Sequence, residues 1–344
     1  MDRQRHLRQA VLWESLPENK VKCNLCCRNC EIKEGELGAC FVRKNIDGKL
    51  YSLNYNRICA ANPDPIEKKP LFHFQPGKKS FSIAAVGCNF RCRYCQNWQI
   101  SQVSPKESDE DESRITPNQI VEAAVKENCS SIAYTYTEPT IFMELCNDCA
   151  KLAKQKGLAN VFVSNGYMTK QAIDFTKGWL DAINIDLKAF TEEYYQYFCR
   201  AKLQPVLDTI KYIAKETDIW MEITTLVVPG QNDSDKELND IARFICEEAG
   251  ENVPWHISRF YPQYKYQDSE PTPLETLEKA YEIGKQAGLK FVYVGNVRGA
   301  NGANTHCPNC GELLIERVGF YIRNNNLEGG RCPDCGAEIP GVEM

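Results

Sequence analysis

The stretch FSIAAVGCNFRCRYCQNW, residues 81–98, places three cysteines directly after a short apolar run that is typical of a β-strand. Cys88, Cys92 and Cys95 share one short loop, and Gly87 before them lets the backbone wrap a bulky group. Three thiolates at this spacing can hold three corners of a cubane iron–sulfur cluster. Since no fourth cysteine lies nearby in the sequence, one iron of such a cluster would remain open to an exogenous ligand.

Beyond this loop, β-rich runs alternate with amphipathic segments of helix length. Such alternation implies right-handed βαβ units and a parallel sheet, either open or curled into a full or partial barrel. Six or seven units favour the barrel, whose chemistry gathers at the carboxyl ends of the strands. The predicted strands are 81–87, 131–137, 160–166, 182–187, 220–228, 255–262 and 290–295, and the predicted helices include 115–128, 139–157, 204–217 and 272–288.

Three parts follow along the chain. Residues 1–75 form a lead-in and a cysteine-rich module, 76–300 the barrel, and 301–344 a second cysteine module. We expect residues 1–20 to be polar and partly helical. The proline-broken run ANPDPIEKKPLFHFQPG, residues 61–77, predicts a linker or lid. The acidic run 108–113 predicts a solvated loop, because like charges resist packing.

Composition narrows the class of protein. The 18 cysteines occur in tight clusters, which favours metal ligation in a reducing compartment over a disulfide framework. A net charge of -5 supplies no general attraction to nucleic acid or anionic membranes. No stretch has the length and apolar character of a spanning helix. We therefore expect a cytoplasmic protein with neither membrane nor nucleic acid as a partner.

Two further cysteine groups predict metal sites. Two Cys-Pro-x-Cys-Gly knuckles near the carboxyl end predict a structural zinc site of ribbon type, with a rubredoxin-like iron site as the alternative. The amino-terminal group predicts either zinc or a second iron–sulfur cluster. The ligands are Cys307, Cys310, Cys332 and Cys335 in the first group, and Cys23, Cys26, Cys30 and Cys40 in the second.

The loop Cys88-x3-Cys92-x2-Cys95, with Tyr94 before its last cysteine, resembles the signature of radical S-adenosylmethionine (SAM) enzymes. The resemblance implies that the three cysteines bind a [4Fe-4S] cluster and that SAM chelates its open iron. It also implies that an electron donor such as ferredoxin or flavodoxin reduces the cluster. Reductive cleavage of SAM would then give methionine and a 5′-deoxyadenosyl radical that abstracts hydrogen from a substrate.

The same resemblance suggests which strand ends hold SAM. Glu138 stands where related enzymes carry a Gly-Gly-Glu-Pro-like element, with Tyr136 and Thr137 replacing the two glycines. A carboxylate there suits the SAM amino group. The other candidates are Ser164, Asn165 and Gly166, similar to the Thr-Asn-Gly of glycyl-radical-enzyme activases, then Asp186 and Lys188, similar to their Asp-x-Lys, and finally His256.

Taken end to end, the motifs resemble the radical SAM enzyme of the AmmeMemoRadiSam system, which is related to the pyruvate formate-lyase activating enzymes. These motifs include DPIEKKPLFHF, GCNFRCRYCQNWQIS, PWHISRFYPQYK and the carboxyl-terminal knuckles. The resemblance implies a protein substrate and association with Memo-type and AMMECR1-type proteins. Two alternatives remain: radical chemistry on a small molecule or RNA, and a zinc-ribbon interaction protein without radical chemistry.

Overall fold

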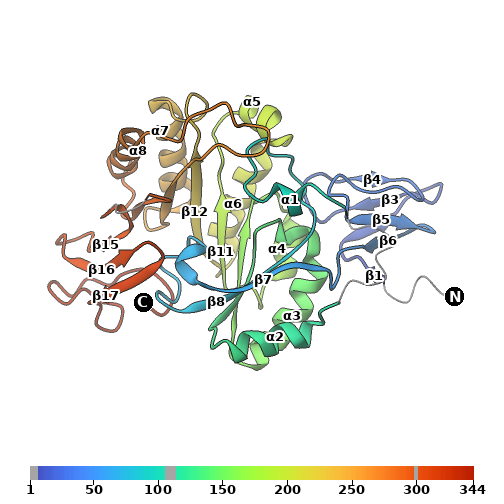
Figure 1. Ribbon diagram of the computed structural model, residues 1–344, viewed down its shortest axis with the longest axis horizontal. Coiled ribbons are helices and arrows are strands. Elements are labelled where there is room, and N and C mark those ends of the chain that lie inside the picture. The colour runs from blue at the N-terminus through green and yellow to red at the C-terminus, as the bar shows by residue number, and fades with distance from the viewer. Residues whose placement is uncertain (1–6, 105–113, 298–300) are drawn as a thin grey trace.

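A central sheet of eight strands organises the computed structural model, which describes residues 7–104, 114–297 and 301–344 (Figure 1). All neighbouring pairs from β8 to β14 are parallel, and β7 joins the edge antiparallel to β8. The spatial order is β14 (Val292–Gly295), β13 (Trp255–Arg259), β12 (Trp220–Val227), β11 (Ala182–Asp186), β10 (Ala159–Ser164), β9 (Ser131–Tyr134), β8 (Lys79–Ala85) and β7 (Ile58–Pro65).

Helices connect the parallel strands, as the alternating pattern predicts. α3 packs against β9 and β10, and α8 packs against β13 and β14. The start of α2 is set by a capping box between Thr116 and Gln119 with proline at the first turn. The helices are α1 (Trp98–Ser101), α2 (Pro117–Lys126), α3 (Met143–Gln155), α4 (Lys170–Thr176), α5 (Glu192–Tyr194), α6 (Gln204–Glu216), α7 (Asp235–Phe244) and α8 (Leu274–Gln286), with π-helical turns at Tyr195–Cys199 and Ile245–Ala249.

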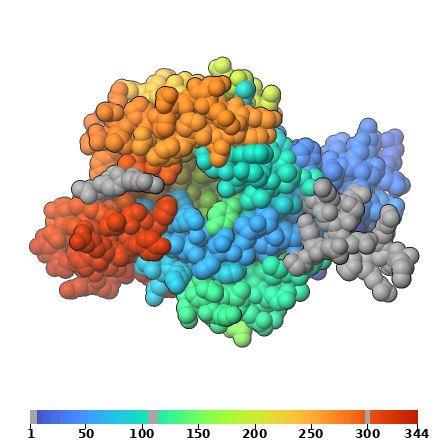
Figure 2. All heavy atoms as spheres, viewed as in Figure 1, coloured from blue at the N-terminus to red at the C-terminus, as the bar shows by residue number. Residues whose placement is uncertain are grey.

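Small antiparallel sheets flank the central sheet at opposite ends of the molecule (Figures 1 and 2). The expectation of a partly helical lead-in is wrong for residues 7–20, which form strands that pair with β3 and β6. The acidic run 108–113 lies outside the described residues. The flanking sheets comprise β2 (Trp13–Ser15), β3 (Val21–Cys23) and β4 (Glu31–Ile32); β1 (Arg8–Gln9), β6 (Lys49–Ser52) and β5 (Arg43–Ile46); and β15 (Thr305–His306), β16 (Leu313–Val318) and β17 (Tyr321–Asn325).

The proline-broken run is not a linker or a lid. Its first part is β7, and residues 66–75 form a plug under the sheet. Ile66, Leu71 and Phe74 of this plug are buried against alanine and valine side chains within the first three residues of β9, β10 and β11. The plug therefore covers the amino-terminal ends of the strands. The carboxyl ends remain available for a catalytic site. We name residues 66–75 the plug from here on.

A buried carboxylate holds the plug in place. Glu222 of β12 accepts hydrogen bonds from the backbone N–H groups of Phe72 and His73, at 2.9 and 2.8 Å. It also accepts from the Trp220 indole at 3.0 Å and lies 2.6 Å from Nε2 of His256. Burial alone would raise the pKa of Glu222, but His256 and these donors lower it below the ordinary value. The carboxylate is thus ionised and fully partnered.

His73 of the plug makes stability depend on pH. Its Nδ1 lies 2.7 Å from the Pro340 carbonyl oxygen, so Nδ1 carries the proton, and Nε2 accepts from the Tyr293 hydroxyl at 2.6 Å. Burial lowers the pKa of His73 from 6.5 to about 4. Because the unfolded chain then binds the proton more readily, we expect the free energy of unfolding to fall as pH decreases from 6.5 toward 4, by about 1.4 kcal/mol per unit.

Urea unfolding between pH 7 and pH 5 measures this slope. The His73→Gln variant cannot titrate at this position and should show a flatter profile than the wild type, even if its stability at pH 7 is lower. Equal slopes in the two proteins would contradict the assignment of the pH dependence to His73.

None of the helices within the described ranges combines the length and the apolar character that a membrane span requires.

Candidate active site

The three-cysteine loop begins where β8 ends. Gly87 adopts φ +97°, and a Cβ added to it would lie 2.6 Å from Cγ1 of Val42 and 3.0 Å from the Cys40 carbonyl oxygen. Only glycine fits both this conformation and this space. The loop therefore leaves the strand in close contact with the amino-terminal module, and it presents its thiols at the carboxyl edge of the sheet.

The three thiols lie in a shielded environment. The Phe90 N–H donates to Cys88 Sγ at 3.3 Å, and Cys95 Sγ lies 3.2 Å from the Ser101 hydroxyl. Burial raises the pKa of Cys88, whereas the neighbouring Cys199 and then burial raise that of Cys92. A buried thiolate of raised pKa needs a cation beside it, and cluster iron provides one. The donor set thus fits an iron–sulfur cluster.

The end of β10 is tied to this loop through Asn165. Its side-chain amide donates to Oδ1 of Asn89 at 2.7 Å and lies 3.9 Å from Cys88 Sγ. The Ser164 hydroxyl donates to Glu138 at 2.8 Å, and the Asn165 backbone N–H donates to the same carboxylate at 2.8 Å. The structure therefore brings the predicted Ser-Asn-Gly element next to the three-cysteine loop.

Glu138 is buried and already partnered by the chain. Besides Ser164 and Asn165, it accepts from the Thr140 N–H at 3.0 Å and the Thr140 hydroxyl at 2.6 Å. Burial raises its pKa, against the opposing effect of these donors. These contacts make Glu138 a positioning residue for the end of β10. Its predicted contact with the SAM amino group stays a prediction.

Gly166 completes the turn after β10. It has φ +69°, and an added Cβ would lie 2.8 Å from Cγ2 of Ile185 and 3.2 Å from Cγ1 of Val206. We expect Gly166→Ala to lower the free energy of unfolding by about 2–4 kcal/mol, since backbone strain and overpacking add. We also expect it to weaken SAM binding, because the turn carries Asn165. Chemical denaturation and equilibrium binding of SAM measure the two effects.

Gly178→Ala is the matched control, because Gly178 has φ +83° with nothing within 4 Å of an added Cβ. It should lower the free energy of unfolding only by the cost of the strained backbone, about 1–2 kcal/mol, and it should leave SAM binding unchanged. Equal losses in the two variants would show that the contacts of Gly166 are irrelevant.

Tyr136 stands where the resemblance leads one to expect glycine, and its backbone behaves as glycine would. It has φ +63°, which is uncommon for a bulky side chain. Its hydroxyl donates to Asp64 at 2.5 Å, and the Lys69 ammonium lies 4.6 Å from its ring centroid. These contacts hold the strained residue, and its carbonyl oxygen accepts from the Asn97 amide at 2.8 Å. The glycine-like turn is thus retained without glycine.

Asp186 and Lys188 follow β11 at the same edge. The Lys188 ammonium lies 2.8 Å from an Asp186 carboxylate oxygen. Burial alone would lower the pKa of Lys188, but Asp186 and the thiols of Cys92 and Cys199 hold it well above its ordinary value. The structure therefore places one anionic and one cationic group near the three-cysteine loop, as the ammonium and carboxylate of an amino acid require.

His256 lies apart from this group. It is near the start of β13, where it contacts Glu222 and stacks on Tyr293 with ring centroids 5.3 Å apart. The edge of the plug residue Phe72 also meets its ring, at 4.7 Å. These contacts connect His256 with the plug rather than with the carboxyl ends of the strands. Its contact with SAM stays a prediction.

One neighbour of the site gave no signal in the sequence. Cys199 ends a π-helical turn, where its sulfur lies 3.6 Å from the Tyr94 hydroxyl and contacts Cys92. No motif surrounds it, and only the packing of this turn against the loop brings it to the site.

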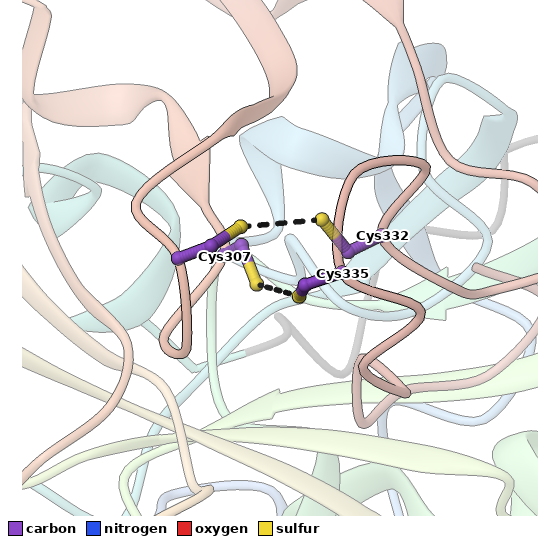
Figure 3. Close-up of side chains that lie close together, drawn as sticks. Cys307, Cys332 and Cys335 are labelled. Atoms are coloured by element: carbon purple, nitrogen blue, oxygen red, sulfur yellow. Dashed lines mark hydrogen bonds between the residues drawn. The ribbon is translucent and has the colours of Figure 1, made fainter.

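The carboxyl-terminal cysteines form a compact quartet (Figure 3). Cys307 and Cys335 sulfurs are 3.6 Å apart, as are those of Cys310 and Cys332, and all four lie within 4.8 Å of one another. Hydrogen bonds from Asn309 and from the backbone of Ala337 lower the pKa of Cys335 to about 6. All 18 cysteines lie in the described ranges, and none of them forms a disulfide there.

The fold and site together define a class: a parallel α/β enzyme with a three-thiol loop at the carboxyl end of its first parallel strand. A family profile described as the radical SAM superfamily matches residues 82–245. An uncharacterized protein of Methanocaldococcus jannaschii is 48% identical over 335 residues, which span 97% of this chain and 99% of the relative. The chain belongs to the radical SAM superfamily.

Two further comparisons refine this. A second protein of that organism, provisionally named a glycyl-radical enzyme activating enzyme, is 31% identical over 59% of this chain and 75% of its own length. A radical SAM methyltransferase from Sphaerobacter thermophilus shares the fold, with a TM-score of 0.50 and 13% identity over 68% of this chain and 70% of that chain. The protein is therefore a radical SAM enzyme that uses an iron–sulfur cluster and SAM, related to the activating enzymes.

Proposed function

We propose that Cys88, Cys92 and Cys95 hold the [4Fe-4S] cluster of this enzyme. The observation that carries the proposal is the position of three shielded thiols in one loop at the carboxyl end of β8. Asn165 lies beside Cys88, and Lys188 acts electrostatically on Cys92. When bound, the cluster supplies the electron that cleaves SAM and releases a 5′-deoxyadenosyl radical.

The chain's own residues orient SAM. The Lys188 ammonium suits the SAM carboxylate, and the Asp186 carboxylate suits its amino group, because both would form charge-assisted hydrogen bonds. The two side chains already pair at 2.8 Å, so each is held near the position where its ligand group would bind. Ser164, Asn165 and Gly166 line the neighbouring strand end, where Glu138 accepts from the Ser164 hydroxyl and the Asn165 backbone N–H.

For the substrate, we propose a residue in a partner protein. Support comes from the relative named among activating enzymes and from the end-to-end resemblance to the AmmeMemoRadiSam radical SAM enzyme. From that resemblance we propose Memo-type and AMMECR1-type proteins as partners, and ferredoxin or flavodoxin as the electron donor. Free thiols throughout the chain agree with a reducing, cytoplasmic compartment.

Deuterium transfer tests the substrate class. The reconstituted enzyme is incubated anaerobically with reductant, SAM and a deuterated Memo-type or AMMECR1-type protein, and 5′-deoxyadenosine is analysed by mass spectrometry. Deuterium in the nucleoside that depends on the partner supports a protein substrate. Transfer from a deuterated small-molecule extract or RNA, with none from either protein, would favour the alternative of a small-molecule or RNA substrate.

For the architecture, we propose a partial parallel barrel within residues 76–300, flanked by modules at 1–75 and 301–344. The pairing order, which begins at β14 and ends at β7, supports an open arrangement.

We assign the carboxyl-terminal quartet to zinc in a ribbon-like module. Two of its sulfur separations are 3.6 Å, close to the edge of about 3.8 Å that a tetrahedron with zinc–sulfur bonds of about 2.3 Å requires.

Replacing Cys310 tests the zinc assignment. We expect Cys310→Ala to lose about one zinc per chain and to lower the free energy of unfolding by at least about 3 kcal/mol, because ligation stabilises a module with little core. SAM cleavage by the folded fraction should persist. Metal analysis and denaturation measure both effects, with Cys246→Ala on the outer π-helical turn as control. Iron without sulfide at this site would indicate the rubredoxin-like alternative.

A further inference from the structure

The amino-terminal cysteines surround one cavity. Cys23 ends β3, Cys26 and Cys30 lie in the following turn, and Cys40 precedes β5. All four line one cavity, whose wall also includes apolar side chains and two arginines. Within the described ranges, the carboxyl-terminal quartet is the one group of ligand atoms that all lie within 4.8 Å of one another. The amino-terminal thiols are therefore spread more widely.

Arg43 lines the same cavity with unused donors. Its side chain is 2% exposed, and one terminal nitrogen donates to both oxygens of Glu144 at 2.8 Å. Its Nε and its other terminal nitrogen are buried without a partner. Buried guanidinium N–H groups without acceptors lower the stability of the fold. We therefore expect the cavity to bind a group that offers hydrogen-bond acceptor atoms to Arg43.

We propose that Cys23, Cys26, Cys30 and Cys40 hold a second [4Fe-4S] cluster, and that Arg43 donates hydrogen bonds to its sulfurs. A single zinc ion would draw four sulfurs to separations near those of the carboxyl-terminal quartet. A cubane instead binds each thiolate on a different iron, so its ligands stand further apart around a larger guest. Both the wider spread and the unused donors of Arg43 favour the cluster.

This second site adjoins the three-cysteine loop. The Cys40 carbonyl oxygen lies 3.0 Å from the position of a Cβ on Gly87. Arg28, which also lines the cavity, donates from Nε to the Asn89 carbonyl oxygen at 3.0 Å. Arg91 donates to the Cys88 carbonyl oxygen at 2.5 Å and to that of Ala39. These contacts place the two cysteine groups next to each other in the fold. Each group nevertheless has its own set of cysteine ligands.

Metal content in full-length variants tests the proposal. The chain is reconstituted anaerobically with iron and sulfide, and iron, sulfide and zinc are measured per chain. Since each cubane contains four irons, we expect about eight irons in the wild type, about four in the Cys88/Cys92/Cys95→Ala variant and about four in the Cys26/Cys30→Ala variant. Zinc should stay near one in all three, at the carboxyl-terminal quartet.

The outcomes separate this inference from the proposed function. A Cys88/Cys92/Cys95→Ala variant that carries about two zincs and no iron, or no second metal at all, would overturn the second cluster. If that variant kept all the iron of the wild type, the second cluster would stand and the assignment of the catalytic loop would fall. EPR of the reduced variant should show a cluster signal that disappears when Cys26 and Cys30 are also replaced.

The role of Arg43 has its own readout. Arg43→Met is combined with Glu144→Gln, because glutamine leaves no unpaired charge and keeps an acceptor for the Val11 N–H. In the Cys88/Cys92/Cys95→Ala background, we expect unchanged iron content and a more negative reduction potential, since hydrogen bonds to cluster sulfurs raise the potential. An unchanged potential would show that Arg43 does not contact the cluster. Arg243→Met on the exposed face of α7 is the control.

Discussion

Cys88→Ala should reduce the formation of 5′-deoxyadenosine from SAM by at least about a thousandfold, equivalent to about 4 kcal/mol in the barrier. The three thiols come from one loop, whereas the nearby Cys199 belongs to a π-helical turn and Asn165 follows β10. In the proposed cluster site, removing one thiol removes the ligand of one iron. The measurement is anaerobic reconstitution, dithionite reduction and chromatography of the nucleoside.

Cys129→Ala is the matched control for this variant. Cys129 is a buried cysteine that lies just before β9, at the opposite end of the parallel strands. We expect its nucleoside yield to match the wild type, with a stability loss of about 1 kcal/mol from the lost sulfur. Substantial nucleoside from Cys88→Ala, or a comparable loss in Cys129→Ala, would mean that this loop does not carry the catalytic cluster.

Glu222→Leu should lower the free energy of unfolding by about 3–5 kcal/mol. The substitution leaves the buried N–H groups of Phe72 and His73 without an acceptor and removes the partner of His256. It should therefore release the plug from the sheet. Denaturant unfolding gives the free energy, and hydrogen exchange of the Phe72 and His73 amides shows whether the plug opens first.

Two variants bracket this result. Glu222→Gln keeps one carbonyl acceptor and should lose less than Glu222→Leu, whereas Glu282→Leu on the exposed face of α8 should stay within about 0.5 kcal/mol of the wild type. A loss below about 1 kcal/mol for Glu222→Leu, with amide protection retained, would show that apolar packing alone holds the plug.

The strands and helices that the periodicity predicts are present, with boundaries that differ by a few residues. The structure also contains α4, α7, the strands of the lead-in and β7, which the sequence analysis does not predict. In β7, Pro63 and Pro65 indicate an irregular segment. A sheet edge tolerates proline, since an N–H that points away from the neighbouring strand is not needed. Whether such a run becomes an edge strand depends on the neighbour it finds, β8, and not on its own composition.

The sequence by itself determined how the cysteines are grouped and spaced, and the strand–helix alternation. Ligand spacing within a loop and periodicity within a segment are local, so they can be read along the chain. Tertiary structure alone decided that Glu138 is occupied by Ser164 and Asn165, that His256 faces the plug, and that Cys199 meets Cys92. Those contacts join residues from separate elements, and only the packing of the sheet and its plug determines which side chains meet.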